Sequence, residues 1–127
     1  MIIKTPISLG ELIDKISILL IKERKITDVK KIDLIHEELT LLKETLNKVT
    51  KDSAIDDYLN QLTDINSALW KIEDELRDCE KNKEFDKKFI DLARSVYITN
   101  DKRAEIKLEI NNKFGSKIVE VKSYTKY

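Results

Sequence analysis

Two long apolar series in the middle of the sequence constrain the fold more than any other feature. The first series runs from Ile32 to Val49 and the second from Ile55 to Cys79, and apolar residues recur in both at spacings of three and four. This spacing places them on one face of a helix. The polar residues 50–53 form a short connection between the two series. We therefore predict an antiparallel helical hairpin with heptad seams.

The composition also favours an all-α protein. Charged residues make up 38% of the 127 residues, and there are only two glycines and one proline, which is typical of solvated helices. The length fits one core, so we predict a single helical domain over residues 1–127, a helical bundle built on the hairpin. The chain ends, 2–5 and 117–122, are rich in β-branched residues. We therefore also consider a small two-stranded β ribbon made by the two ends.

Two further helices are expected on either side of the hairpin in the sequence. Ser8 and Glu11 form a capping box, which predicts that the first helix begins near Leu9. Its apolar residues fall on two opposite faces, which indicates that this helix is covered on two sides. The fourth helix is expected to open near residue 84 and to stop near Gly115.

Charge and hydropathy limit the cellular compartments and the classes of partner that we expect. Lys plus Arg and Asp plus Glu both number 24, so the net charge is zero and we expect no nucleic-acid partner. Cys79 is the only cysteine and cannot form an internal disulfide. No apolar stretch is long enough to serve as a signal core or a membrane span. We therefore expect a cytoplasmic protein without a membrane span.

The fourth helix carries polar residues where its apolar face should continue. If the helix is unbroken, Asn100, Arg103 and Lys107 lie on the face that apolar residues occupy earlier in the same helix. Two cations and an amide at these spacings can converge on one anion, and Arg103 can make a bidentate contact. These residues predict a pocket for a phosphate or carboxylate, with Arg94 and Tyr97 at its rim.

A second interpretation gives the same residues no function. The helix would break at residues 99–101, and Asn100 or Asp101 would cap a new helix. The residues after the break would then have a new angular position relative to the earlier apolar face, and both cations would lie on the surface. Because buried charge is rare in proteins, the sequence alone favours this second interpretation.

A separate polar group lies at the start of the first helix. It consists of Glu11, Asp14 and Lys15. Carboxylates at a helix start interact favourably with the helix dipole, which explains them without any function. As an alternative, the three residues are polar partners of the pocket, and Glu11 or Asp14 is then the only candidate for a general acid or base.

The sequence lacks the residues that several kinds of metal and cofactor site require. His36 is the only histidine and forms one carboxylate–histidine motif with Asp33, whereas a di-iron helical site needs two such motifs. The chain has no CxxC or HExxH motif, and two glycines cannot build a phosphate-binding loop. We therefore expect no metal and no cofactor, and the sequence leaves open whether the protein is an enzyme.

Four stretches are specific in combination: Pro6-Ile7-Ser8-x-Gly10-Glu11-Leu12-Ile13-Asp14-Lys15-Ile16, Leu69-Trp70-x-Ile72-Glu73-Asp74-x-Leu76-Arg77, Leu92-Ala93-Arg94-Ser95-Val96-Tyr97-x-x-Asn100-Asp101-x-Arg103-Ala104 and Gly115-Ser116-x-Ile118-Val119-Glu120-x-Lys122-Ser123-Tyr124. Together they resemble an uncharacterised family of short bacterial and phage proteins, a domain of unknown function. The resemblance covers nearly the whole chain, although Val121 replaces a second Glu that the family tends to carry. Members occur beside glycosyltransferase-like proteins, so the resemblance implies a link to surface-glycan synthesis.

The start of the first helix also resembles the first helix of the all-α chorismate mutases. The likeness rests on Ile13-Asp14-x-Ile16, followed by Leu19-Leu20 and Arg24. Those enzymes use Arg and Lys from long helices to hold a dicarboxylate, often across a dimer. This resemblance implies a small-molecule enzyme as one alternative function.

The leading hypothesis is a small intracellular binding protein with an anion pocket on the fourth helix. We expect a homodimer, formed through the second apolar stripe of the first helix or through the hairpin. The main alternative is a structural or adaptor protein whose exposed coiled-coil flank binds another protein. In that alternative the same cations form internal salt bridges.

Overall fold

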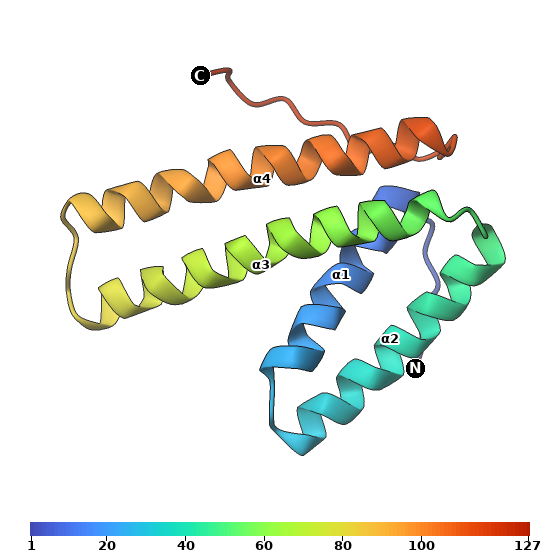
Figure 1. The fold of residues 1–127 in the computed structure, drawn as a ribbon, viewed down its shortest axis with the longest axis horizontal. Helices are drawn as coiled ribbons and strands as arrows, with labels where there is room; N and C mark the ends of the chain where they lie inside the picture. The colour runs from blue at the N-terminus through green and yellow to red at the C-terminus, as the bar shows by residue number, and fades with distance from the viewer.

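The computed structural model describes all 127 residues and contains four helices and no strand (Figure 1). The prediction of an all-α helical bundle is therefore confirmed. The helices are α1 (Leu9–Lys25), α2 (Val29–Val49), α3 (Ala54–Lys81) and α4 (Lys87–Lys113). None of them is both long and apolar enough to cross a membrane.

The first two helices begin at capping residues that the sequence contains. Ser8 Oγ accepts a hydrogen bond of 3.1 Å from the Glu11 amide, and α1 begins at Leu9 as predicted. Asp28 caps α2 in the same way, since its Oδ1 accepts a bond of 3.0 Å from the Lys31 amide. Such caps satisfy amides that have no partner inside the helix. The Asp28 cap lies in the short turn between α1 and α2 and fixes where α2 begins.

The helices pack as two antiparallel pairs, α1 with α2 and α3 with α4 (Figure 1). α1 also contacts both α3 and α4, whereas α2 and α3 do not pack against each other. The predicted hairpin between residues 32–49 and 55–79 is therefore wrong. Each apolar series required a partner helix, and α1 supplies that partner to both because it carries apolar residues on two faces.

α1 is central because it contributes to two separate cores. On one side, Leu12, Ile16 and Leu19 pack against Ile35 and Leu39 of α2. The second core joins Ile13 of α1 to residues of α3 and α4, namely Ile55, Leu62 and Ile110. Burial of these side chains is the main apolar contribution to the stability of the fold.

The start of α1 lies unusually close to α4. A Cβ atom on Gly10 would lie 2.5 Å from the backbone oxygen of Lys107, so the approach requires glycine at this position. The Gly10 amide donates to Asn111 Oδ1 at 2.7 Å, and the Leu9 amide donates to Ser116 Oγ at 3.2 Å. These acceptors satisfy free amides at the helix start. The contact fixes α1 on α4 and places its first turn beside the polar face of α4.

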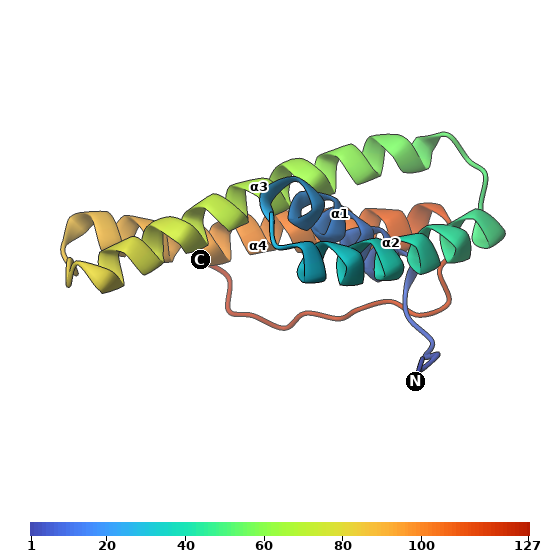
Figure 2. The same ribbon diagram turned by 90° about the horizontal axis from the view of Figure 1, so that it is seen from below.

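The two chain ends form no β ribbon, because neither residues 2–5 nor residues 117–122 are in a strand. Residues 116–127, which we call the C-terminal segment, instead run back along α4 (Figures 1 and 2). The segment is held there by side chains of α4 rather than by a second strand. Glu120 and Tyr127 contact Lys107 and Asp101, respectively.

α3 and α4 extend well past α1 and α2, at the left of Figure 1. We call this part, residues 69–98, the arm. Between Ser67 and Ile106 only Cys79 is buried, so the arm has almost no core of its own. All other buried residues lie in the remaining part of the molecule, which we call the body.

Candidate functional site

α4 is continuous through residues 99–101, and the interpretation that it breaks there is wrong. Asn100, Arg103 and Lys107 consequently share one face of the helix. Lys107 is only 8% exposed, and the Arg103 side chain is 27% exposed. The break was expected because buried charge is rare. It does not occur because α1 brings carboxylates to both cations.

Asp14 of α1 is fully buried and forms the centre of this polar cluster. Its Oδ1 accepts hydrogen bonds from Arg103 Nε at 3.0 Å and from Asn66 Nδ2 at 2.8 Å, and its Oδ2 accepts one from Arg103 Nη2. The hydrogen bonds to Asp14 raise the pKa of Arg103 above its usual value. A buried carboxylate needs such a pairing, because loss of its hydration is costly.

Ser17 extends the same network one turn along α1. Asn66 Nδ2 also donates to Ser17 Oγ at 2.8 Å, and Ser17 Oγ donates to the Asp14 carbonyl oxygen at 2.6 Å. No buried side-chain nitrogen or oxygen lacks a hydrogen-bond partner. A fully satisfied network of this kind fixes the orientation of its members.

Lys107 joins α4 to α1 and to the C-terminal segment. Its Nζ lies 2.7 Å from Glu11 Oε2, 3.0 Å from Glu120 Oε2 and 3.9 Å from Asp14 Oδ2. Burial alone would lower the pKa of Lys107, but hydrogen bonds to Glu11 and Glu120 raise it above its usual value. Lys107 therefore stays charged and is already surrounded by carboxylates.

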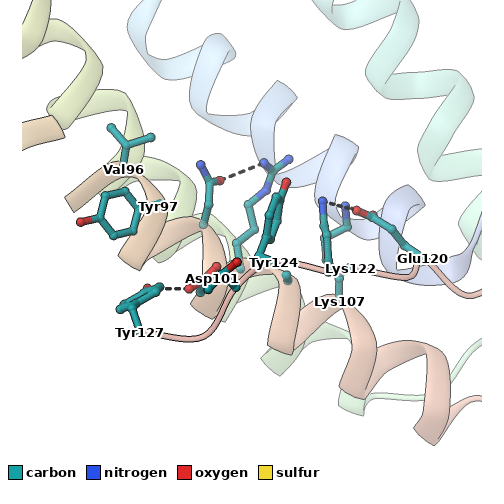
Figure 3. A pocket seen from close by; sticks show the side chains of 12 residues that line it. Val96, Tyr97, Asp101, Lys107, Glu120, Lys122, Tyr124 and Tyr127 are labelled. Carbon is teal, nitrogen blue, oxygen red and sulfur yellow. Dashed lines mark hydrogen bonds and ion pairs between the residues drawn. The ribbon is translucent and has the colours of Figure 1, made fainter. Parts of the chain in front are cut away.

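Glu120 joins the C-terminal segment to α4 through Lys107 and also pairs with Lys122 of the same segment. Its Oε1 lies 2.6 Å from Lys122 Nζ, and its Oε2 contacts Lys107 (Figure 3). The hydrogen bonds from Lys122 and Lys107 lower the pKa of Glu120 to about 2. The carboxylate is therefore ionised at all ordinary pH values.

A cavity of about 600 Å³ lies between α4 and the C-terminal segment (Figure 3). At one end Tyr127 Oη donates to Asp101 Oδ2 at 2.5 Å, which raises the pKa of Tyr127 to about 12. The rings of Tyr97 and Tyr127 meet edge to face at 5.3 Å. Lys107 and Glu120 lie at the other end, and Tyr124 lies between the two ends. The cavity thus has an aromatic end and a charged end.

The structure brings most of the predicted site residues together. Four of the five predicted ligand-binding residues line this cavity: Tyr97, Asn100, Arg103 and Lys107. Arg94 is exposed and does not line it. Of the predicted polar partners, Glu11 and Asp14 contact the cations, whereas Lys15 is exposed and forms no ion pair.

Sequence reasoning missed two groups of residues in the site. Asn66 lies on the apolar face of α3, one turn from Leu62, and this polar break in the series was a signal for a buried hydrogen bond. The other group lies in the C-terminal segment and comprises Glu120, Lys122, Tyr124, Thr125 and Tyr127. No spacing in the sequence indicated that these residues return to α4.

Arg103 and Asn100 also line a second cavity, of about 590 Å³, on the side that faces α3. Its walls come from the last turns of α1, the start of the arm on α3, and α4. Arg103 therefore separates two openings. No cluster of three or more His, Cys, Asp or Glu side chains forms a candidate metal site.

The sequence model of the family DUF6165 matches residues 3–127. This chain belongs to the DUF6165 family. DUF6165 is described as a family of unknown function, so the predicted membership in such a family is confirmed and the function of the chain is unknown. No curated protein and no solved structure matches the chain. The bacterial or phage origin and the likeness to chorismate mutases stay predictions.

Proposed function

We propose that this DUF6165 protein is a small intracellular binding protein whose ligand carries a phosphate or carboxylate group. The ligand would occupy the cavity between α4 and the C-terminal segment. The observation that carries this proposal is the anchoring of Arg103, whose guanidinium is held by the buried Asp14 and lines the cavity. The predicted link to surface-glycan synthesis stays a prediction.

Arg103 retains donors for a ligand. A guanidinium has five N–H groups, of which two donate to Asp14 and one donates to Asn100 Oδ1 at 3.4 Å, so two remain. Because Asp14 fixes the side chain, little conformational entropy would be lost when an anion binds. Arginine also suits the planar, bidentate recognition of carboxylate and phosphate groups.

The charges around the cavity favour a small anion. Its lining carries three cations, Arg103, Lys107 and Lys122, and two carboxylates, Asp101 and Glu120. Lys107 already contacts carboxylates, so in this proposal Arg103 and Lys122 contact the ligand. Lys122 is 45% exposed, and a bound anion would compete with Glu120 for its ammonium group. The exposed tyrosines at the other end would cover the uncharged part of the ligand.

The proposal includes no catalytic step. Asp14 is fully buried and accepts three hydrogen bonds on its carboxylate, and Glu11 contacts Lys107. Neither carboxylate is free to exchange a proton with a ligand in the cavity.

One observation favours the adaptor function as a second candidate. The ion pairs of Arg103 and Lys107 are internal and tie α4 to α1, so they explain both cations without a ligand. In this second candidate the polar cluster is structural, and another protein binds the exposed apolar residues. The adaptor and the binding protein differ in whether a small anion stabilises the fold.

A thermal-shift screen with phosphate, nucleotide sugars and dicarboxylates distinguishes the two candidates. A ligand at 100 times its Kd stabilises the folded state by about 2.7 kcal/mol, which raises the melting temperature by several degrees. We expect such a rise in the native protein, and a smaller rise in Lys122→Gln and Tyr124→Ala, whose side chains are not part of the buried core.

Lys117→Gln is the matched control, because Lys117 is exposed and does not line the cavity. Arg103→Ala tests the anchor, but it leaves Asp14 without its main partner, so its own stability must be measured first. Titration calorimetry then gives the affinity of any hit for each variant. If no ligand class raises the melting temperature, or if Lys122→Gln and Tyr124→Ala respond as the native protein does, the anion-binding function is wrong.

A further inference from the structure

Residues 117–127 of the C-terminal segment depend on side chains alone for their place on α4. They are all exposed, they belong to no helix or strand, and no backbone-to-backbone hydrogen bond involves them. Two hydrogen bonds between side chains join them to α4, namely that of Glu120 with Lys107 and that of Tyr127 with Asp101. A stretch with so few buried contacts opens at a small cost in free energy. The segment can therefore leave α4 while the helices stay folded.

Glu120 contacts two of the three cations that line the cavity and acts on the third through its charge. Its oxygens meet different ammonium groups, since Oε2 lies 3.0 Å from Lys107 Nζ and Oε1 lies 2.6 Å from Lys122 Nζ (Figure 3). The pKa of Arg103 is raised mainly by its hydrogen bonds to Asp14, and the charge of Glu120 adds to this effect. The Glu120 carboxylate thus bridges α4 and the segment, as a bound carboxylate or phosphate group would.

The charges around this end of the cavity balance only while Glu120 is in place. The group consists of three cations and three carboxylates: Arg103, Lys107, Lys122, Asp14, Glu11 and Glu120. Asp14 and Glu11 are fixed on the helix α1, whereas Glu120 belongs to the segment that can leave. Without the Glu120 carboxylate, three positive and two negative charges remain, a net charge of +1. An anion from another molecule at the same place would restore the balance.

We propose that the Glu120 carboxylate occupies the place of the ligand's anionic group, so that the C-terminal segment is a built-in competitor of the ligand. This inference rests on the anion-binding function proposed above. The carboxylate or phosphate group of the ligand replaces Glu120 between Lys107 and Lys122, and it then holds the segment on α4 in place of Glu120. The ligand-free protein is therefore autoinhibited, because its anion site is filled until a ligand displaces Glu120.

Competition by Glu120 lowers the affinity of the native protein for its ligand. In the native protein, the ligand must break the contacts of Glu120 with two ammonium groups before it makes its own. In Glu120→Gln, no carboxylate has to be displaced. The apparent affinity for a ligand falls with the fraction of molecules whose site is free, and this fraction is larger in the variant. We therefore expect the Kd of inorganic phosphate to be about fivefold lower in Glu120→Gln, the effect of one partly exposed ion pair.

The first test is titration calorimetry of inorganic phosphate at pH 7 with the native protein, Glu120→Gln and Glu109→Gln. Glu109→Gln removes the same charge from an exposed position outside the cavity and should bind phosphate as the native protein does. Tighter binding by Glu120→Gln alone supports the competition. If the native protein and Glu120→Gln bind phosphate equally well, the anion-binding function stands and the competition is wrong. If neither protein binds phosphate, both are wrong.

The second test asks whether a free anion can take the place of the missing side chain. Acetate carries the carboxylate of Glu120 without its chain, and phosphate is the second probe. In Glu120→Gln, either anion should return the ring NMR signals of Tyr124 and Tyr127 to their native positions in a saturable way. Sodium chloride at the same ionic strength should not, and the added change Lys122→Gln should abolish the response. If calorimetry detects phosphate binding but the ring signals stay those of a free segment, the anion binds elsewhere and the inference is overturned.

Discussion

Within α3 and α4, the body and the arm differ in what the helices bury. In the body, where α1 lies against them, Asn66, Lys107 and Asn111 are buried although they are polar. In the arm, Ile90 of α4 and Phe85 of the turn between the two helices are about half exposed although they are apolar. The body thus buries polar side chains next to its apolar cores, whereas the arm leaves apolar side chains in solvent.

The difference shows that burial in this protein follows the position of α1. α1 carries an apolar stripe that covers α3 and α4, and it also carries Asp14 and Glu11, which pair with the cations of α4. Charged groups become tolerable in the interior when a partner of opposite sign replaces the lost hydration. Beyond α1 no such cover is available, and Glu73 and Arg77, on the face of α3 that carries Asn66, are exposed.

The largest expected effect comes from removal of the central charge of the body. Asp14→Asn keeps the shape of the side chain but leaves Arg103 without its anion, and loss of one partner of a buried pair typically costs about 3–5 kcal/mol. We expect the free energy of unfolding, measured by urea denaturation, to fall by this amount.

Asp91→Asn is the control for this change, because Asp91 forms an exposed ion pair with Lys87 in the arm. Exposed pairs of this kind contribute little to stability. We therefore expect no measurable change in this control. If the two variants have similar stabilities, the polar cluster of the body is not a stabilising network.

A second prediction compares one leucine from each region. Leu62 is fully buried in the body, and Leu62→Ala should lower the free energy of unfolding by about 2–5 kcal/mol. Leu76 of the arm is only partly buried, so Leu76→Ala removes fewer contacts, and its effect should be less than half as large. Urea denaturation at low protein concentration measures both. Equal losses would mean that the arm is as well packed as the body.

The smallest expected effect concerns the C-terminal segment and its dependence on pH. Glu120 has a pKa of about 2 instead of its ordinary 4.5. Its contribution to stability is therefore complete above pH 4.5 and is lost as the pH falls from 4.5 towards 2. We expect the ring NMR signals of Tyr124 and Tyr127 to move towards those of a free segment over this range.

Glu120→Gln should give the same free-segment signals already at neutral pH, with little change in global stability because Glu120 is partly exposed. Glu109→Gln is the matched control, since Glu109 is an exposed carboxylate of α4 that forms no ion pair. Ring signals of Glu120→Gln that match those of the native protein would show that Glu120 does not hold the segment.

The sequence predicted the helices better than it predicted their partners. The caps at Ser8 and the apolar spacing located α1, and the all-α class followed from periodicity and composition. The hairpin between residues 32–49 and 55–79 was wrong, because periodicity shows that a helix has an apolar face but not which helix covers it. The two-sided apolar pattern of the first helix was the signal for its central place.

The candidate site was predicted in part. At about 100° per residue, an unbroken helix places Asn100, Arg103 and Lys107 on one face, and α4 is unbroken. The sequence favoured a break at residues 99–101, because it could not show that Asp14 and Glu11 would come within hydrogen-bonding distance of the cations. Glu120 and the tyrosines of the C-terminal segment return to α4 only through tertiary contacts.

The sequence by itself determined which residues form helices and which faces of them are apolar, because these depend on local spacing and caps. Only the tertiary structure decided that α1 lies between α2 and α3, that Asp14 meets Arg103, and that the arm projects without cover. These outcomes depend on contacts between residues far apart in the chain. The physical reason is the direction of α1: it runs obliquely away from α3 towards the turn with α2, so no third helix lies along the arm (Figure 1).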